Sequence, residues 1–455
     1  MKQVATRRDR LSLWHLSWPI AIELFLQFLM GTIDTVMVSR IGDQAVSASG
    51  ISNQLITAAM TLFALISAGV SIVLAQKWGR GDLEGARRVA IIAIQANLAA
   101  GLAVSLFFAI DSGMVLDLMN TPPDVEPFAG TYLRIVGGST LIVVLHAVVN
   151  AAIRSTGNTR GPMYISVGMN VVHLVLNWLL IFGHGGFPEL GIEGAAYSTV
   201  ISRLAALAFA GWLLWKTFQP TWQWREWLMI DRAILREVMR IGVPVSLTAV
   251  SWGFSQVVIL RLVSDMGSDR LAAYAYLQTI QQWPWIAASA IAGGLGIRVS
   301  QLYGAGEHAE MYASLRRGIV PGMALVVFVS GLIYLLGDEV LSLFTSSSDI
   351  IGIAMPILAL TIGWMPLRTI GLLASTSLNA VGEARSVGYM SVFGMWVLAA
   401  GGAYWLGDLA GYGLLGVFVA AVIDEIVRSS FFIWRWRRLK PQTHQSIPSM
   451  AERSG

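Results

Sequence analysis

A small number of charged side chains interrupt the long apolar stretches of this chain. A charge at the centre of a bilayer costs about 2.5 to 3.5 kcal/mol even on the mildest scale, so such groups normally face a bundle interior or a cavity. There they pair with one another, bind a substrate, or carry an ion or a proton. The charged residues of this kind are Glu23, Asp34 and Arg203 in the N-terminal half and Arg368, Asp424 and Glu425 in the C-terminal half.

The depth of each charge in its helix indicates which of them can pair. At about 1.5 Å of rise per residue, Glu23 and Arg203 both fall near the middle of their helices, and Asp34 lies about three turns farther along. We therefore expect an ion pair between Glu23 and Arg203, which leaves Asp34 without a fixed cation. A carboxylate in that situation can load and release a proton, or hold a cationic substrate.

The first apolar stretch also has a polar edge. Glu23, Gln27, Met30 and Asp34 follow one another at spacings of 4, 3 and 4 residues, which places them on one face of a helix. Such an edge suggests the wall of a cavity, and Gln27 and Met30 are therefore candidate substrate contacts. The alternative is that these polar groups satisfy one another inside the bundle, which applies more readily to Glu23 than to Asp34.

In the C-terminal half, Arg368 can neutralise Asp424 or Glu425, and we expect these residues to form a structural clasp. Aromatic side chains can line a pocket for organic cations, because their ring faces attract positive charge. Trp252 and Trp283 are the candidates for such contacts, although most tryptophans are expected to pack or to lie at the membrane interface.

The residue types that other chemistries need are missing or scattered. There is no Cys, and the six His do not cluster. No H-E-x-x-H or G-x-S-x-G motif and no phosphate-binding G-x-x-x-x-G-K-[ST] loop occurs. The sequence therefore predicts no catalytic residue, no metal site and no cofactor, and it argues against a membrane enzyme or an ATP-driven pump. Energy for transport would come from an ion gradient.

These charges lie in a chain suited to cross a membrane many times. Apolar residues make up 55% of it and charged residues only 13%, against about 25% charged in ordinary soluble proteins. Long windows are free of Asp, Glu, Lys and Arg, and three more contain isolated charges. The charge-free windows are 44–76, 89–110, 135–153, 161–188, 241–260, 271–297, 318–337, 350–367 and 386–407, and the others are 11–39, 191–215 and 411–434. The sequence therefore predicts an all-α integral membrane protein with twelve transmembrane helices.

The basic residues favour one side of the predicted membrane. With both termini inside, most Lys and Arg of the loops fall on the cytoplasmic side, and the opposite loops carry mainly Asp and Glu. This asymmetry accounts for the net charge of +4, so nucleic acid is not expected as a partner. We predict a monomer that crosses a bacterial-type cytoplasmic (inner) membrane many times, among membrane lipids, with both termini cytoplasmic.

An internal repeat divides the chain into two halves of six helices each. At an offset of 225 residues the matched pairs include Pro19 with Pro244, Gly81 with Gly306 and Gly157 with Gly382, and after a three-residue adjustment Gly194 meets Gly416. Parallel repeats of this kind occur in secondary transporters, whose lobes rock around a central cavity. The predicted domains are an N-lobe at 1–217, an interlobe cytoplasmic linker at 218–231, a C-lobe at 232–440 and a flexible cytoplasmic tail at 441–455.

Several segments resemble one transporter family, multidrug and toxic compound extrusion (MATE). They are WPIAIELFLQFLMGTIDTVMVSRIGDQAVSASGISNQ in the first helix, AQKWGRGD after the second, IRSTGNTR after the fourth, MNVVHLVLNWLLIFG in the fifth and GIEGAAYSTVIS in the sixth. The resemblance covers nearly the whole chain and includes the repeat of six plus six helices. It implies two pseudo-symmetric six-helix lobes around a V-shaped central cavity, and export of organic cations in exchange for protons or sodium.

By position, the resemblance assigns an ion-coupling site to Asp34 in the first helix, His173 and Asn177 in the fifth, and Thr199 in the sixth. His173 has an alternative reading, because a lone His in an apolar helix is more often a hydrogen-bonded core residue. The carboxylate that the family often has in the fifth helix is missing here. The C-lobe acids that hold sodium in one branch of the family are also replaced, so protons are favoured over sodium as the coupling ion.

Two transport functions remain open from the sequence. The first is a cation-coupled antiporter that exports small cationic or amphipathic molecules by alternating access. The second is a lipid or polyprenyl-linked oligosaccharide flippase of a related fold. Such flippases tend to need several cationic residues in the cavity for an anionic headgroup, whereas the candidates here balance or lean acidic unless Arg203 and Arg261 are unpaired.

Overall fold

The computed structural model describes residues 12–219, 226–227 and 231–445, and no strand occurs among them. The linker predicted at 218–231 and the tail predicted at 441–455 therefore lie partly outside the described residues. Residues 441–445 are not separate from the last helix but continue it.

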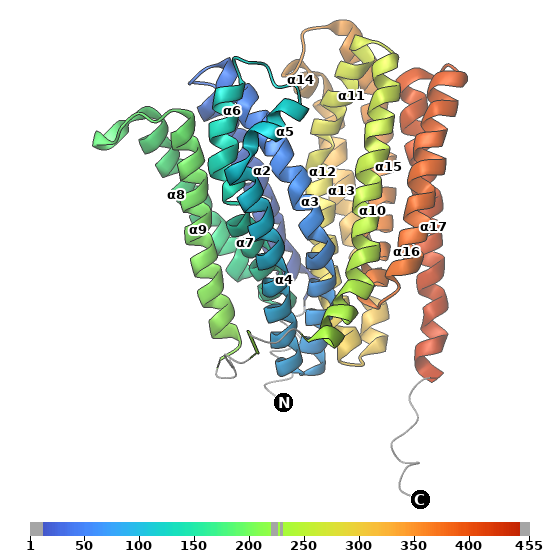
Figure 1. Cartoon of the computed structure of the whole chain (residues 1–455). Coiled ribbons are helices and arrows are strands. Elements are labelled where there is room, and N and C mark those ends of the chain that lie inside the picture. Colours follow the sequence, from blue (N-terminus) through green and yellow to red (C-terminus); the bar gives the residue numbers. More distant parts are fainter. Residues whose placement is uncertain (1–11, 220–225, 228–230, 446–455) are drawn as a thin grey trace, which may run out of the picture. The chain divides into compact units, whose positions relative to one another are not determined.

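The first half of the described chain is a series of helices (Figure 1). They are α2 (Leu13–Val38), α3 (Asp43–Arg80), α4 (Leu83–Ile110), α5 (Ser112–Leu118), α6 (Glu126–Tyr132), the π-helix η1 (Leu133–Gly137), α7 (Thr140–Ser155), α8 (Arg160–Phe182), the 3-10 helix η2 (His184–Gly186) and α9 (Ile192–Thr217). The π-helix η1 continues α6, and α7 follows after a bend of 43°.

The second half repeats this pattern. Its helices are α10 (Arg232–Asp265), α11 (Ser268–Ile280), α12 (Gln282–Gly304), α13 (His308–Leu335), α14 (Gly337–Ser342), α15 (Ser348–Ala380), α16 (Ala384–Phe393), the π-helices η4 (Gly394–Ala400) and η5 (Ala403–Leu409), and α17 (Gly413–Gln445). The widened turns of η4 and η5 directly continue α16.

Within the described residues, eight helices are long and apolar enough to cross a membrane, or nine when the bent pair 126–137 and 140–155 counts as one span. Helix α17 has the length but fails this test, since Asp424, Glu425 and Arg428 all fall in its apolar part. Those charges satisfy one another, as described below, so they are compatible with a membrane-spanning helix.

Contacts divide the chain into two units. The N-unit is Ile22–Val243, and the C-unit is Met1–Ala21 together with Pro244–Gly455. The division falls inside α2 and α10, close to the matched prolines Pro19 and Pro244, whereas the predicted lobes at 1–217 and 232–440 keep each of these helices whole. The N-unit therefore contains the last part of α2 and the first part of α10.

The glycines matched by the repeat have the same backbone role in both halves. Gly81 ends α3 with a φ of +81°, and Gly306 follows α12 with a φ of +75°. This left-handed conformation suits glycine, since it has no Cβ to clash. Gly157 and Gly382 are a second matched pair, with φ of +92° and +89°. The repeat in the sequence thus corresponds to a repeat of helix endings.

A close helix contact in the N-unit also depends on a matched glycine. A Cβ on Gly194 of α9 would lie 2.4 Å from the Leu180 carbonyl oxygen of α8, so any larger residue would push the two helices apart. In the C-unit the matched Gly416 meets the Leu406 carbonyl oxygen in the same way, at 2.6 Å. The approach of α9 to α8 brings their polar side chains within hydrogen-bonding distance.

Candidate ion-coupling site and charge network

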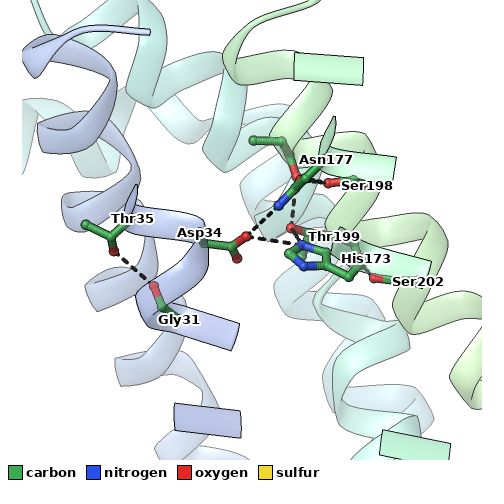
Figure 2. A network of polar contacts seen from close by, with 9 residues as sticks. Gly31, Asp34, Thr35, His173, Asn177, Ser198, Thr199 and Ser202 are labelled. Carbon is green, nitrogen blue, oxygen red and sulfur yellow. Dashed lines mark hydrogen bonds and ion pairs between the residues drawn. The ribbon is translucent and has the colours of Figure 1, made fainter. Parts of the chain in front are cut away.

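Asp34 in α2 forms a polar network with α8 and α9 in the N-unit (Figure 2). The Asn177 side-chain amide donates a hydrogen bond to Asp34 Oδ1 at 2.8 Å. Asn177 is fully buried, whereas the Asp34 side chain is 23% exposed. Asp34 therefore lies where a buried polar cluster meets accessible space.

The orientation of the Asn177 amide is fixed from α9. The Ser198 hydroxyl shares its hydrogen between the Asn177 side-chain oxygen and the backbone carbonyl of Ala195, and Ser198 is itself fully buried. Because that oxygen accepts from Ser198, the amide nitrogen is the atom that faces Asp34. Ser198 was not among the predicted site residues. It stands one position before the predicted Thr199 in GIEGAAYSTVIS, so its place beside that residue was the available signal.

His173 is the second group beside Asp34. Its Nε2 lies 3.4 Å from Asp34 Oδ1 and 3.2 Å from the Thr199 hydroxyl oxygen. That hydroxyl donates to the backbone carbonyl of Ala195 at 2.9 Å, so it accepts from His173. The Nε2 atom then carries a hydrogen and acts as a donor. His173 is only 2% exposed, as a hydrogen-bonded core histidine would be, and it also contacts the carboxylate.

The groups around Asp34 are mainly hydrogen-bond donors. Asn177 and His173 both direct nitrogen atoms at Oδ1, and Oδ2 has no hydrogen-bond partner among the described residues. Hard metal cations prefer several oxygen ligands, and no cluster of three His, Cys, Asp or Glu suited to a metal occurs in the described part of the chain. A proton needs only the free oxygen of Asp34.

The ion pair predicted between Glu23 and Arg203 is wrong. Glu23 instead accepts a hydrogen bond from Arg154 Nη1 at 2.7 Å, and their side chains are 14% and 29% exposed. Arg154 belongs to the IRSTGNTR segment at the end of α7. Arg203 forms no hydrogen bond or ion pair within the residues that the structure describes, and it acts on Asp34 electrostatically at longer range. Asp34 therefore has no Arg or Lys in direct contact within the described part of the chain; the reason is the pairing of Glu23 with Arg154, not with Arg203.

The predicted clasp between Arg368 and the C-unit acids is also wrong. Arg428 of α17 binds both acids of its own helix: its Nη2 lies 2.8 Å from Asp424 Oδ2 and 2.7 Å from Glu425 Oε2. The Arg428 Nε donates to both oxygens of Asp424 as well, at 2.8 and 3.0 Å. Arg368 is left to stack on tryptophan rings.

Comparison with known proteins identifies the family. The MatE family model matches residues 19–179 and 244–405, so both matches begin at the paired prolines of the repeat. The chain belongs to the MatE family. The uncharacterized transporter YisQ of Bacillus subtilis (strain 168) is 30% identical over 426 residues, 94% of each chain. The probable multidrug resistance protein NorM of Thermotoga maritima is 23% identical over 97% of this chain and 96% of that one.

Solved structures of MATE proteins share the fold of this MatE chain. A multidrug resistance MATE family transporter of the MOP superfamily in an outward-facing conformation has a TM-score of 0.84 at 22% identity, over 95% of this chain and 96% of that one. A MATE protein in the bent conformation gives the same TM-score at 21% identity. The predicted family and the all-α fold with twelve transmembrane helices are confirmed, and the protein is a membrane transporter rather than an enzyme.

The four predicted coupling residues of the MatE chain lie together, whereas the predicted substrate contacts are dispersed. Gln27 is exposed and Met30 is buried, although the spacing placed both on one face with Asp34. Trp283 is 44% exposed. Trp252 lines a cavity in the C-unit. The roles of these residues in substrate binding remain predictions.

Proposed function

We propose that this chain is a secondary antiporter that exports organic cations or amphipathic drugs by alternating access, with protons rather than sodium as the coupling ion. The observation that carries the proposal is the environment of Asp34, a partly exposed carboxylate that no Arg or Lys of the described residues contacts directly. The names of relatives such as the probable multidrug resistance protein NorM support a drug as substrate.

The same carboxylate can couple the two fluxes. When Asp34 is ionised, its charge attracts an organic cation, and a proton on Oδ2 removes that charge. Proton entry and cation release then favour each other, which gives the two states the different affinities that antiport requires. Asn177 and His173 act by positioning Oδ1, so that Oδ2 is the oxygen that exchanges the proton.

Sodium fits this environment less well. A sodium ion would need oxygen atoms around the carboxylate, but the nearest side-chain atoms of Asn177 and His173 are nitrogens. The Asn177 oxygen is directed to Ser198, and the Thr199 hydroxyl to the backbone of its own helix. Turning these groups towards an ion would break hydrogen bonds in a buried site.

The setting that we propose follows from the charges of the loops. Basic residues gather on one side of the membrane and acids on the other, which supports a cytoplasmic (inner) membrane location with both termini in the cytoplasm. Each lobe has its own buried polar cluster, and a monomer among membrane lipids is sufficient for the proposed cycle.

The experiment is ethidium transport in proteoliposomes under an imposed pH gradient without sodium. We expect wild-type transport to proceed and Asp34→Asn to abolish it, because an amide of similar size cannot titrate. Asp265→Asn is a matched control: that carboxylate is 59% exposed at the end of α10, beside Arg261. Loss of wild-type transport without sodium would refute proton coupling. Full gradient-driven transport by folded Asp34→Asn would refute the role of Asp34.

A further inference from the structure

The C-unit contains a cavity of about 530 Å³. This volume is within the range of about 300 to 1,000 Å³ typical of small-molecule sites. Its wall is formed by residues of α10, α11, α12, α15, α16, η4 and α17, all within the C-unit. The cavity is distinct from the Asp34 network, which belongs to the N-unit.

Arg368 of α15 provides an uncommitted positive charge in this wall. Its guanidinium carbon lies 4.2 Å from the ring centroid of Trp285 and 5.7 Å from that of Trp364. Arg368 forms no hydrogen bond and no ion pair with any described residue. Stacking uses the face of the guanidinium and leaves its N–H edge available to an acceptor.

Glu425, which lines the cavity, and its neighbour Asp424 do not occupy that edge. Arg428 holds Glu425 at 2.7 Å and Asp424 at 2.8 Å, while Glu425 and Arg368 interact only over a longer distance. With both arginines charged, the four groups sum to a net charge of zero. An anion that enters the cavity therefore meets one guanidinium with free donors and two carboxylates that already have a cation.

Neutral polar groups in the same wall also lack partners. Gln281, between α11 and α12, is 4% exposed, and neither its amide nitrogen nor its amide oxygen has a hydrogen-bond partner among the described residues. The side-chain oxygen of Asn379 is likewise unpartnered there. A buried amide without partners costs free energy. A ligand that supplies a donor and an acceptor would recover it.

The repeat indicates that this arrangement is specific to the C-unit. At the offset of 225 residues, Arg154 of the N-unit corresponds to Asn379, and its partner Glu23 corresponds to Thr248. Both Thr248 and Asn379 line the cavity. The C-unit thus has two small neutral side chains where the N-unit has an ion pair. Arg368 corresponds to an apolar residue, Val143, so its charge is not a common feature of the two halves.

We propose that this cavity binds the carboxylate of an aromatic organic acid or zwitterion. The planar N–H edge of Arg368 matches the two oxygens of a carboxylate. Gln281 and Asn379 would bind other polar atoms of the ligand, and the half-exposed Trp252 offers a ring face to its apolar part. This inference goes beyond the proposed export of cations, since it adds molecules with a negative group to the compounds that the chain recognises.

The test is a binding measurement that needs no ion gradient, so it does not depend on the proposed coupling mechanism. Isothermal titration calorimetry on the purified full-length protein in detergent would compare 1-naphthaleneacetate with 1-naphthaleneacetamide, which share the aromatic body and differ in charge. We expect the acid to bind at least about tenfold more tightly than the amide, as a charge-assisted hydrogen bond to a guanidinium implies. Equal binding of the two probes would overturn the proposal.

Variants of Arg368 test whether this residue causes the preference for the acid over the amide. Arg368→Gln should abolish it, whereas Arg368→Lys, which retains the charge without the planar edge, should still bind the acid but several-fold more weakly. Arg261→Gln is the matched control, since Arg261 is 77% exposed and is not part of the cavity wall. An acid preference that survives in folded Arg368→Gln would refute the assignment. So would binding of dioctanoyl phosphatidic acid at Arg368 without binding of 1-naphthaleneacetate, because the cavity would then be a lipid-phosphate site.

Discussion

The ion pair between Glu23 and Arg154 makes a quantitative prediction about stability. Arg154 Nη1 lies 2.7 Å from Glu23 Oε1, and the side chains of Glu23 and Arg154 are 14% and 29% exposed. Two unit charges about 4 Å apart attract each other by about 4 kcal/mol at an effective dielectric constant near 20. Desolvation offsets part of that attraction, and the partial exposure of Arg154 screens it further. We therefore expect a coupling energy of about 1 to 3 kcal/mol.

The perturbation is a double-mutant cycle of Glu23→Gln, Arg154→Gln and both together. Each single change leaves the opposite charge in a partly desolvated place without its partner, so both singles should lower stability. The second oxygen of Glu23, Oε2, has no hydrogen-bond partner among the described residues, so the charge of this carboxylate depends on Arg154 or on water for its compensation. The double variant leaves neither charge, and its loss should be smaller than the sum of the single losses.

The assay is thermal unfolding of the purified protein in one detergent, with the apparent melting temperatures compared across the cycle. A second cycle pairs Glu23→Gln with Arg203→Gln, which tests the pairing that helix depth alone predicted. We expect clear non-additivity with Arg154 and additivity within about 0.5 kcal/mol with Arg203. Additive losses in the first cycle, or coupling confined to the second, would refute the reasoning.

Two further predictions concern other buried contacts. Arg87 donates two hydrogen bonds to Glu226, at 2.8 and 2.6 Å, and they hold the pKa of Glu226 below its ordinary value. The stabilisation of the folded protein by this contact is therefore present at neutral pH and is lost as the pH falls through the lowered pKa. Glu226→Gln should therefore melt below wild type at pH 7, and the difference should shrink as the pH falls below the ordinary carboxyl value of about 4.3 and through the lowered pKa of Glu226, where the folded state is protonated as well; a difference that persists unchanged in acid would contradict this. Ser198→Ala removes the donor to the buried oxygen of Asn177 and should cost about 1 to 3 kcal/mol and slow proton-driven ethidium transport. Ser202→Ala, which removes only a bond to the carbonyl of Thr199 in its own helix, is the control, and equal transport rates for the two variants would show that Ser198 does not orient the amide.

The composition and the repeat were sufficient to predict the fold class, because bilayer crossing imposes a length and an apolar content on every span. The charge pairs were harder to predict. Depth along a helix was used to match Glu23 with Arg203, but depth does not state which face of the helix a residue occupies. Arg154 comes directly after the charge-free window 135–153 and therefore lies outside the predicted span. A long Arg side chain can reach back from such a position.

In the C-terminal half the sequence itself contains the signal for the observed ion pairs. Asp424, Glu425 and Arg428 are three and four residues apart on one helix, which is the spacing at which side chains meet. Local pairing within α17 therefore competes with any pairing across to α15, and the local pair forms at 2.7 to 2.8 Å. Arg368 is left available for the rings of Trp285 and Trp364.

Residues at matched positions of the repeat show which features the two halves share and which features differ. The two halves retain helix-ending glycines such as Gly157 and Gly382, whose positive φ few other residues would tolerate. They do not retain the chemistry: Asp34 corresponds to Ile259, and Arg368 corresponds to Val143. Backbone geometry must be kept for each half to fold, whereas a buried charge is free to differ as long as a partner or a ligand satisfies it.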